Sequence, residues 1–285
     1  MREEAELVFT AAPRGNRSYW VISVKRLLRK KLGLACLSII LLMYGAGILS
    51  PLVTPYDYND QNLAEAKQGP SFGHPFGTDR LGRDILTRII YGLRTTVIIT
   101  VITLITGSLV LGISMGLVAG YFGKIYDTII MRVGEVTSAF PEIFLVLIFI
   151  ATIKPPITDW VRGIEDTLGI DIVKLGVADY LVLSLALAIF SWFGMARLVR
   201  GQVLQARENQ YVEAARAIGV TSPSILFRHV LPNIMGPIIV LVSAGLAGVA
   251  GSEVFLSFLG IGVQPPTPSL GLMIFENASI SVLRT

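Results

Sequence analysis

Residues 211–232 read YVEAARAIGVTSPSILFRHVLP, a polar stretch between two segments that are apolar enough to cross a bilayer. Residues 209–218 favour a helix, and Gly219 is suited to the position just after its last turn. Thr221 or Ser222 followed by Pro223 has the chemistry of a new helix start. The stretch therefore predicts two short helices that meet at a sharp turn, the second ending at Leu231-Pro232.

The chain as a whole has the composition of a protein that is solvated largely by lipid. Of its 285 residues, 53% are hydrophobic and only 15% are charged, and the mean hydropathy is +0.66. These values predict an all-α integral membrane protein. Cys36 is the single cysteine, which excludes an intrachain disulfide and makes redox chemistry a poor hypothesis.

Five apolar runs come close to the length of about 20 residues that a helix needs to cross a bilayer. They are residues 32–56, 95–120, 133–153, 178–196 and 234–259. We expect residues 1–31 to be a cytoplasmic N-terminal tail, 32–56 the first transmembrane helix, 57–94 an external loop, and 95–285 the membrane core.

Glycines recur at helical spacing in the second and fifth runs. They are Gly107, Gly112, Gly116 and Gly120 in the second run, and Gly245, Gly248 and Gly251 in the fifth. They either place small residues on a shared packing face or reflect the general frequency of glycine in membrane helices.

The positions of Lys and Arg predict the orientation in the membrane. Eight of the 24 basic residues precede Leu32, and residues 197–232 carry five basic residues against two acidic ones. Both segments are therefore expected in the cytoplasm, with 57–94 and 154–178 outside. The clustering before Leu32 fits a topology signal, so the sequence pI near 9.2 does not predict a nucleic-acid partner.

The polar hairpin, from about residue 207 to 232, is expected to project from the cytoplasmic face. Glu213 and Arg216 are placed to pair along one side of its first helix. Its apolar side would consist of Val212, Ala215 and Ile218. That side either fits a groove on a partner protein or lies on the lipid headgroups.

Several of these stretches resemble the permeases of binding-protein-dependent ABC importers. Glu213-Ala214-Ala215, then Gly219, then Leu231-Pro232, is similar to the cytoplasmic Glu-Ala-Ala motif of that family. His229, within FRHVLPN, resembles the dipeptide and oligopeptide branch, as do residues 76–88 and 256–266. The resemblance covers about residues 30–275 and points to the C-type subunit of a permease pair.

The resemblance implies a type I ABC importer transmembrane domain in the plasma (inner) membrane of a bacterium or archaeon. Its partners would be a homologous permease in a heterodimer, two ATP-binding subunits and an extracytoplasmic solute-binding protein. The implied ATPase-coupling residues are Glu213, Ala214, Ala215, Gly219, His229, Leu231 and Pro232. The branch handles dipeptides and oligopeptides, and also nickel complexes and glutathione. Because such permeases usually have a further span, a sixth is expected beyond the end of the sequence.

We expect no catalytic residue, metal site or cofactor in this chain. Gly123-Lys124 lacks the remainder of a phosphate-binding loop, so ATP and magnesium would be bound by partner subunits. His74 and His229 are far apart in the predicted topology. The charged residues of 79–84 invite a catalytic or metal interpretation, but the flanking glycines favour a turn with a structural or docking role.

Two carboxylates within the spans are candidates for the substrate path. Glu253 either contacts substrate or holds the turn that follows the fifth run. Glu142 follows Pro141, where a loosened helix can admit a polar group. Arg197 and Arg200 are expected to anchor the fourth run at the headgroups.

The competing class is a secondary transporter or channel driven by an ion gradient. A proton-coupled carrier would bury titratable groups in the membrane, and Glu142 and Glu253 are the only candidates. An intramembrane enzyme is less favoured, because the spans carry no paired carboxylates or nucleophile motif.

Overall fold

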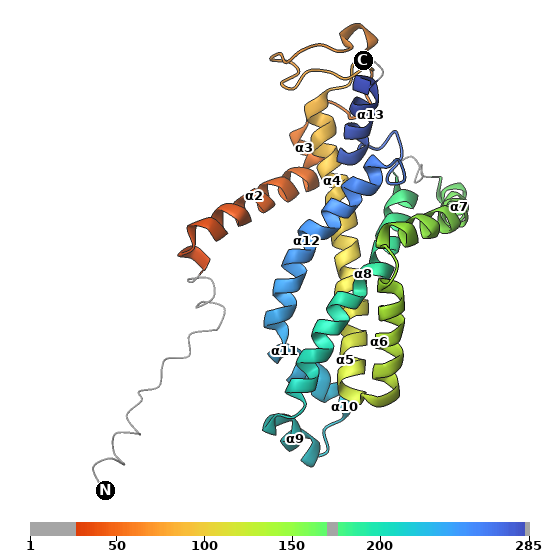
Figure 1. Ribbon diagram of the computed structural model, residues 1–285. Coiled ribbons are helices and arrows are strands. Elements are labelled where there is room, and N and C mark those ends of the chain that lie inside the picture. Colours follow the sequence, from red (N-terminus) through yellow and green to blue (C-terminus); the bar gives the residue numbers. More distant parts are fainter. Residues whose placement is uncertain (1–26, 170–175, 283–285) are drawn as a thin grey trace. The chain divides into compact units, whose positions relative to one another are not determined.

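The structure, a computed structural model, describes residues 27–169 and 176–282 (Figure 1). The chain divides into two compact units, Met1–Gly45 and Ala46–Thr285. The described part of the first unit consists mainly of α2 (Lys31–Ile48), which continues for three residues into the second. This apolar helix is long enough to cross a membrane.

Among the described residues of the second unit, the regular elements are helices, apart from an isolated β-bridge between Thr78 and Asp84. Its long elements are α4 (Ile85–Thr103), the π-helix η2 (Leu104–Gly112), α5 (Ile113–Phe122), α6 (Lys124–Ser138), α7 (Glu142–Leu168), α8 (Val177–Ala206), α12 (Met235–Phe258) and α13 (Leu270–Val282). The short ones are α3 (Ser50–Val53), η1 (Leu63–Glu65), α9 (Gln210–Ala217), α10 (Ser222–Ser224), the π-helix η3 (Ile225–Val230) and α11 (Leu231–Asn233).

Five helices among the described residues are long and apolar enough to cross a membrane. They are Lys31–Ile48, Ile85–Phe122, Glu142–Thr167, Val177–Ala206 and Met235–Phe258. The second is the continuous helix formed by α4, η2 and α5. The predicted all-α architecture with five spans is confirmed.

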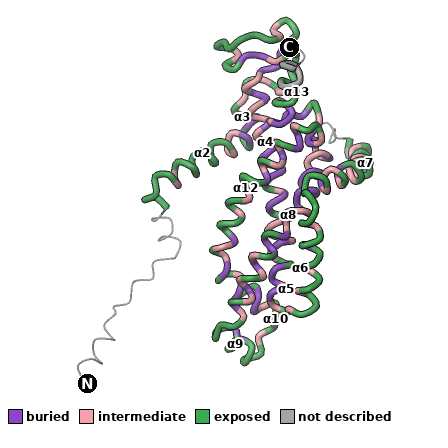
Figure 2. The backbone as a smooth tube through the Cα atoms, in the orientation of Figure 1, coloured by how far each residue is buried: buried purple, intermediate pink, exposed green. Residues whose placement is uncertain are grey.

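The helix α8 lies at the centre of the core. More than half of its most apolar stretch is buried, and α4 and α5 lie along it (Figure 2). The glycines of the second run account for this contact: a Cβ on Gly116 would lie 2.6 Å from Val199 Cβ, and one on Gly120 would lie 2.7 Å from Val203 Cβ. Gly107 and Gly112 meet α8 equally closely. The predicted small-residue packing face therefore exists in the second run.

The glycines of the fifth run behave differently. A Cβ added to Gly248 or Gly251 would meet nothing within 4 Å, and one added to Gly245 would touch only Leu104. These glycines are therefore not a packing face within this chain.

The second span begins ten residues earlier than the sequence predicted, inside the expected 57–94 loop. Asp84 caps this helix, since its Oδ2 accepts a hydrogen bond of 2.7 Å from the Thr87 N–H. In the sequence, the charge of Arg88 argued against a membrane helix at this position. In the structure Arg88 is buried, and its guanidinium lies 2.7 Å from the Asp79 carboxylate. A paired charge can occupy a helix that an unpaired one would exclude.

The third run, 133–153, is not one helix. Helix α6 ends at Ser138 and α7 begins at Glu142, with Pro141 between them. Proline disfavours the helical conformation of the residue before it, which accounts for the break. Helix α7 then continues to Leu168, so much of the predicted 154–178 loop is helical.

Candidate coupling hairpin and translocation cavity

The polar hairpin forms at one end of the second unit, beside the turn between α5 and α6 (Figure 1). Helix α9 covers Gln210–Ala217, and Gly219 follows it with a φ of +79°, a value that suits glycine. Thr221 stands before α10, which has Pro223 in its first turn. The helix, turn and helix predicted for residues 209–232 are thus present.

The second half of the hairpin is less regular than predicted. The chain passes through α10, the π-helix η3 and α11, which places Leu231 and Pro232 at the start of a short helix rather than at an end. His229 is half-buried in η3, and its carbonyl accepts a hydrogen bond from Asn233 Nδ2 at 2.7 Å.

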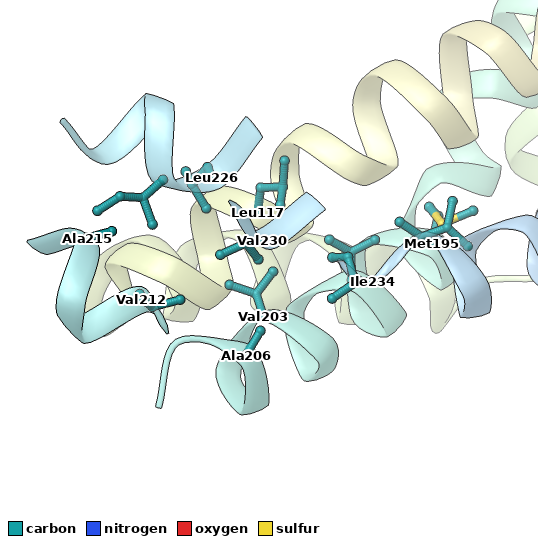
Figure 3. Packing of buried hydrophobic residues seen from close by; sticks show 12 residues of the cluster. Leu117, Met195, Val203, Ala206, Val212, Ala215, Leu226, Val230 and Ile234 are labelled. Atoms are coloured by element: carbon teal, nitrogen blue, oxygen red, sulfur yellow. The ribbon is translucent and has the colours of Figure 1, made fainter. Parts of the chain in front are cut away.

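The hairpin has its own hydrophobic interior. Figure 3 shows Val212 and Ala215 of α9 directed toward Leu226 and Val230 of η3, with Val203 of α8 beside them. Both α9 side chains are buried in this cluster. The prediction that Val212 and Ala215 face a partner is therefore wrong, because the hairpin uses them to attach α9 to α8 and η3.

The outer side of α9 carries Glu213, Ala214 and Ile218, all exposed. Ile218 is 81% exposed although it is a large apolar residue. Arg216 does not form the predicted ion pair with Glu213: its guanidinium lies 5.0 Å from the centre of the Tyr121 ring.

Two further arginines join α8 to the turn between α5 and α6. Arg200 makes a bidentate ion pair with Asp127 of α6, with Nε to Oδ1 at 2.5 Å and Nη2 to Oδ2 at 2.6 Å. Arg207 Nη1 donates to the Gly120 carbonyl at 3.2 Å. The expectation that Arg200 anchors a span at the headgroups overlooked Asp127, which lies 73 residues away in sequence. Arg197 instead lies 4.5 Å from the centre of the Phe193 ring.

Two cavities lie among η2, α7, α8 and α12. Their volumes are about 360 and 380 Å³. The residues that line both are Glu142, Leu187, Gly248 and Ser252. The larger one is also lined by Ser108, Ser191 and Gly245. The open glycines of the fifth run thus form part of a cavity wall.

The two carboxylates predicted near the substrate path occupy different environments. Glu142, the first residue of α7, lines both cavities. Glu253 lines neither and is 0% exposed. It accepts hydrogen bonds from Thr96 Oγ1 at 2.6 Å and from Ser257 Oγ at 2.9 Å, and so connects α12 to α4.

The charged loop before α4 is held together by ion pairs. Asp79 accepts hydrogen bonds from Arg83 Nε and Arg88 Nη1, each at 2.7 Å, and Arg88 reaches Glu276 of α13 at 3.3 Å. Burial alone would raise the pKa of the Asp79 carboxyl, but its hydrogen bonds with Arg83 and Leu81 hold it below the ordinary value. This geometry agrees with a structural role.

His74 and His229 do not come together. His74 Nδ1 lies 2.9 Å from Asp84 Oδ1 in the loop, whereas His229 belongs to the hairpin. Within residues 27–169 and 176–282, no cluster of three or more His, Cys, Asp or Glu side chains is placed to hold a metal ion.

Five helices that are long and apolar enough to cross a membrane, with a cavity between several of them and a polar hairpin that has its own core, define a multi-pass membrane protein. The chain belongs to the family described as binding-protein-dependent transport system inner membrane component, which matches residues 108–283. Residues 18–70 match the N-terminal transmembrane domain of oligopeptide transport permease C.

Named relatives are similar over most of the chain. The dipeptide transport system permease protein of Alkalihalophilus pseudofirmus is 35% identical, with 91% of this chain and 78% of the relative covered. The oligopeptide permease protein of Bacillus subtilis is 33% identical over 90% and 76%. The glutathione transport system permease protein of Pectobacterium atrosepticum is 34% identical over 94% and 80%.

Proposed function

We propose that the chain is the C-type permease subunit of an ATP-driven importer of dipeptides or oligopeptides. It would form the translocation path as a heterodimer with a homologous permease. Two further subunits would bind ATP and magnesium, and an extracytoplasmic protein would deliver the solute. The names of the dipeptide and oligopeptide relatives support peptides as cargo, and the glutathione relative supports glutathione as the alternative.

The observation that carries this proposal is the construction of the hairpin. Val212 and Ala215 attach α9 to the membrane core, which leaves Glu213, Ala214 and Ile218 free on the outside. An exposed apolar residue beside a small one and a carboxylate suits a groove on a partner. Movement of α9 would pass into α8 through the shared core and into α6 through Arg200 and Asp127.

The proposal includes an orientation. The N-terminal tail and the hairpin would face the cytoplasm, which puts the turn between α5 and α6 on the same side. The loop before α4 and helix α13 lie at the opposite end of the second unit (Figure 1) and would receive the solute-binding protein. Part of α7 would add to that surface.

The test is assembly of the full complex with hairpin variants. We expect Glu213→Ala and Gly219→Asp to reduce co-purification of the ATP-binding subunits and to lower ATP-dependent uptake. Gly219→Asp forces a side chain into a left-handed backbone conformation at a cost of about 1–2 kcal/mol. Glu135→Ala, which removes an exposed carboxylate of α6, is the matched control. Normal assembly and uptake in both hairpin variants would contradict the coupling role.

A further inference from the structure

The cavities beside α7 are lined by an ionisable side chain, that of Glu142. Among the described residues that line them, only Glu142 can carry a charge, and the rest are apolar or small apart from the serines. Among the described residues, no side chain makes an ion pair or hydrogen bond with the Glu142 carboxylate. Glu142 is exposed on this chain and belongs to one of the five candidate spans, and ionisable residues within the spans of transport proteins commonly mark the path of the cargo.

A second observation in the same place concerns a buried hydroxyl group. Ser191 lines the larger cavity, and its Oγ is buried without a hydrogen-bond partner in the described part of the chain. A buried hydroxyl without a partner costs free energy, which a ligand or bound water would recover. Ser252 reaches both cavities from α12. Serine hydroxyls both donate and accept, as the amide groups of a peptide require.

We propose that Glu142, together with Ser191 and Ser252, forms a binding site for a positively charged ammonium group of the transported solute. In a peptide this group is a lysine side chain. The inference rests on the proposed function and adds to it a preference for cationic over anionic cargo. Attraction between unlike charges is strengthened where apolar walls lower the local dielectric, and an anion there is repelled for the same reason.

Three glycines of α12 leave space for a ligand beside Glu142. Gly245, Gly248 and Gly251 of α12 line the cavities and meet little or nothing of their own chain where a Cβ would stand. Their side of α12 thus stays open next to Glu142. A volume of about 380 Å³ is within the range of small-molecule sites.

The test compares uptake of two dipeptides by the complete transporter in membrane vesicles, one with a lysine and one with a glutamate side chain. Glu142→Gln should lower the initial rate for the lysine peptide about tenfold, which corresponds to about 1.4 kcal/mol. The rate for the glutamate peptide should stay the same or rise. Glu135→Gln, which removes a carboxylate of α6 outside both cavities, should change neither rate. An equal fall for both peptides, or no fall, would overturn the inference.

A second measurement detects binding of the dipeptide at the site without measuring transport. Ala247→Cys places a thiol in the cavity wall, with Cys36→Ala removing the native thiol. The lysine dipeptide should slow labelling of this thiol, and Glu142→Gln should abolish the protection. Protection that persists in Glu142→Gln would refute the ammonium site. If the wild-type complex shows no ATP-dependent uptake of any peptide, the proposed function fails instead, so the two failures are distinct.

Discussion

Removal of the ion pair between Asp127 and Arg200 is expected to uncouple ATP hydrolysis from transport. Its two charge-assisted hydrogen bonds, at 2.5 and 2.6 Å, join α6 to α8 near the hairpin. Such bonds contribute about 1.5–3 kcal/mol each when fully buried. The side chains are 33% and 20% exposed, so solvent screening leaves about 1–2 kcal/mol for the pair. A loss of that size raises the population of a detached α6 about 5- to 30-fold.

The assay is a double-mutant cycle on the reconstituted complex, with solute uptake per ATP hydrolysed as the readout. Asp127→Ala and Arg200→Ala should each lower this ratio, and the double variant should be no worse than either single one. ATPase activity itself should remain, because α9 and its exposed side chains are unchanged. Exchange of the two residues, Asp127→Arg with Arg200→Asp, should restore part of the ratio.

The control is the exposed pair between Arg132 and Glu135 on α6. Its side chains are 75% and 51% exposed, and such pairs contribute about 0–1 kcal/mol. Arg132→Ala should therefore leave coupling unchanged. If Asp127→Ala and Arg200→Ala keep the wild-type ratio, or if their effects simply add, the pair does not transmit movement and the reasoning is refuted.

Three further outcomes are expected. Gly116→Val should lower the stability of the solubilised protein by about 1–3 kcal/mol through overpacking against α8. Gly201→Ala should not, because a Cβ at that position has no neighbouring atom within 4 Å. Thermal unfolding of the two variants tests the difference. Glu253→Ala should cost about 2–4 kcal/mol, because two buried hydroxyls lose their acceptor, and equal melting temperatures would contradict this. The pKa of Asp79 is lowered from 3.8, so the contribution of its ionised carboxylate to stability is present above about pH 4 and is lost as the pH falls below that value. Limited proteolysis should therefore show the loop loosening in acid, and Asp79→Asn should remove this acid dependence. An unchanged acid profile in Asp79→Asn would argue against the prediction.

The number of the spans was accessible from the sequence because a membrane helix must be long and apolar. Helix ends were less accessible where tertiary pairing overrides local composition. The charge of Arg88 predicts a loop residue, and only the structure shows the ion pairs with Asp79 and Glu276 that allow it to lie in a helix. The break before Glu142 was signalled by Pro141, yet apolar residues on both sides concealed it.

The hairpin shows the same limit at the level of side chains. Its helix, turn and helix followed from the glycine, threonine and proline positions. Which face of α9 is covered depends on η3 and α8, which are distant in sequence, so Val212 and Ala215 were assigned to the wrong side. Likewise, an unpartnered Ser191 hydroxyl has no signature in the sequence. The coupling roles of His229, Leu231 and Pro232 stay predictions.

Uptake by vesicles that contain the complete complex tests the central claim most directly. Solute uptake is measured with ATP on the cytoplasmic side and no ion gradient, and then with an imposed ion gradient and no ATP. We predict uptake in the first condition alone, and its loss when the ATP-binding subunits are left out. Uptake that follows the ion gradient without those subunits would identify a secondary transporter and contradict the assignment.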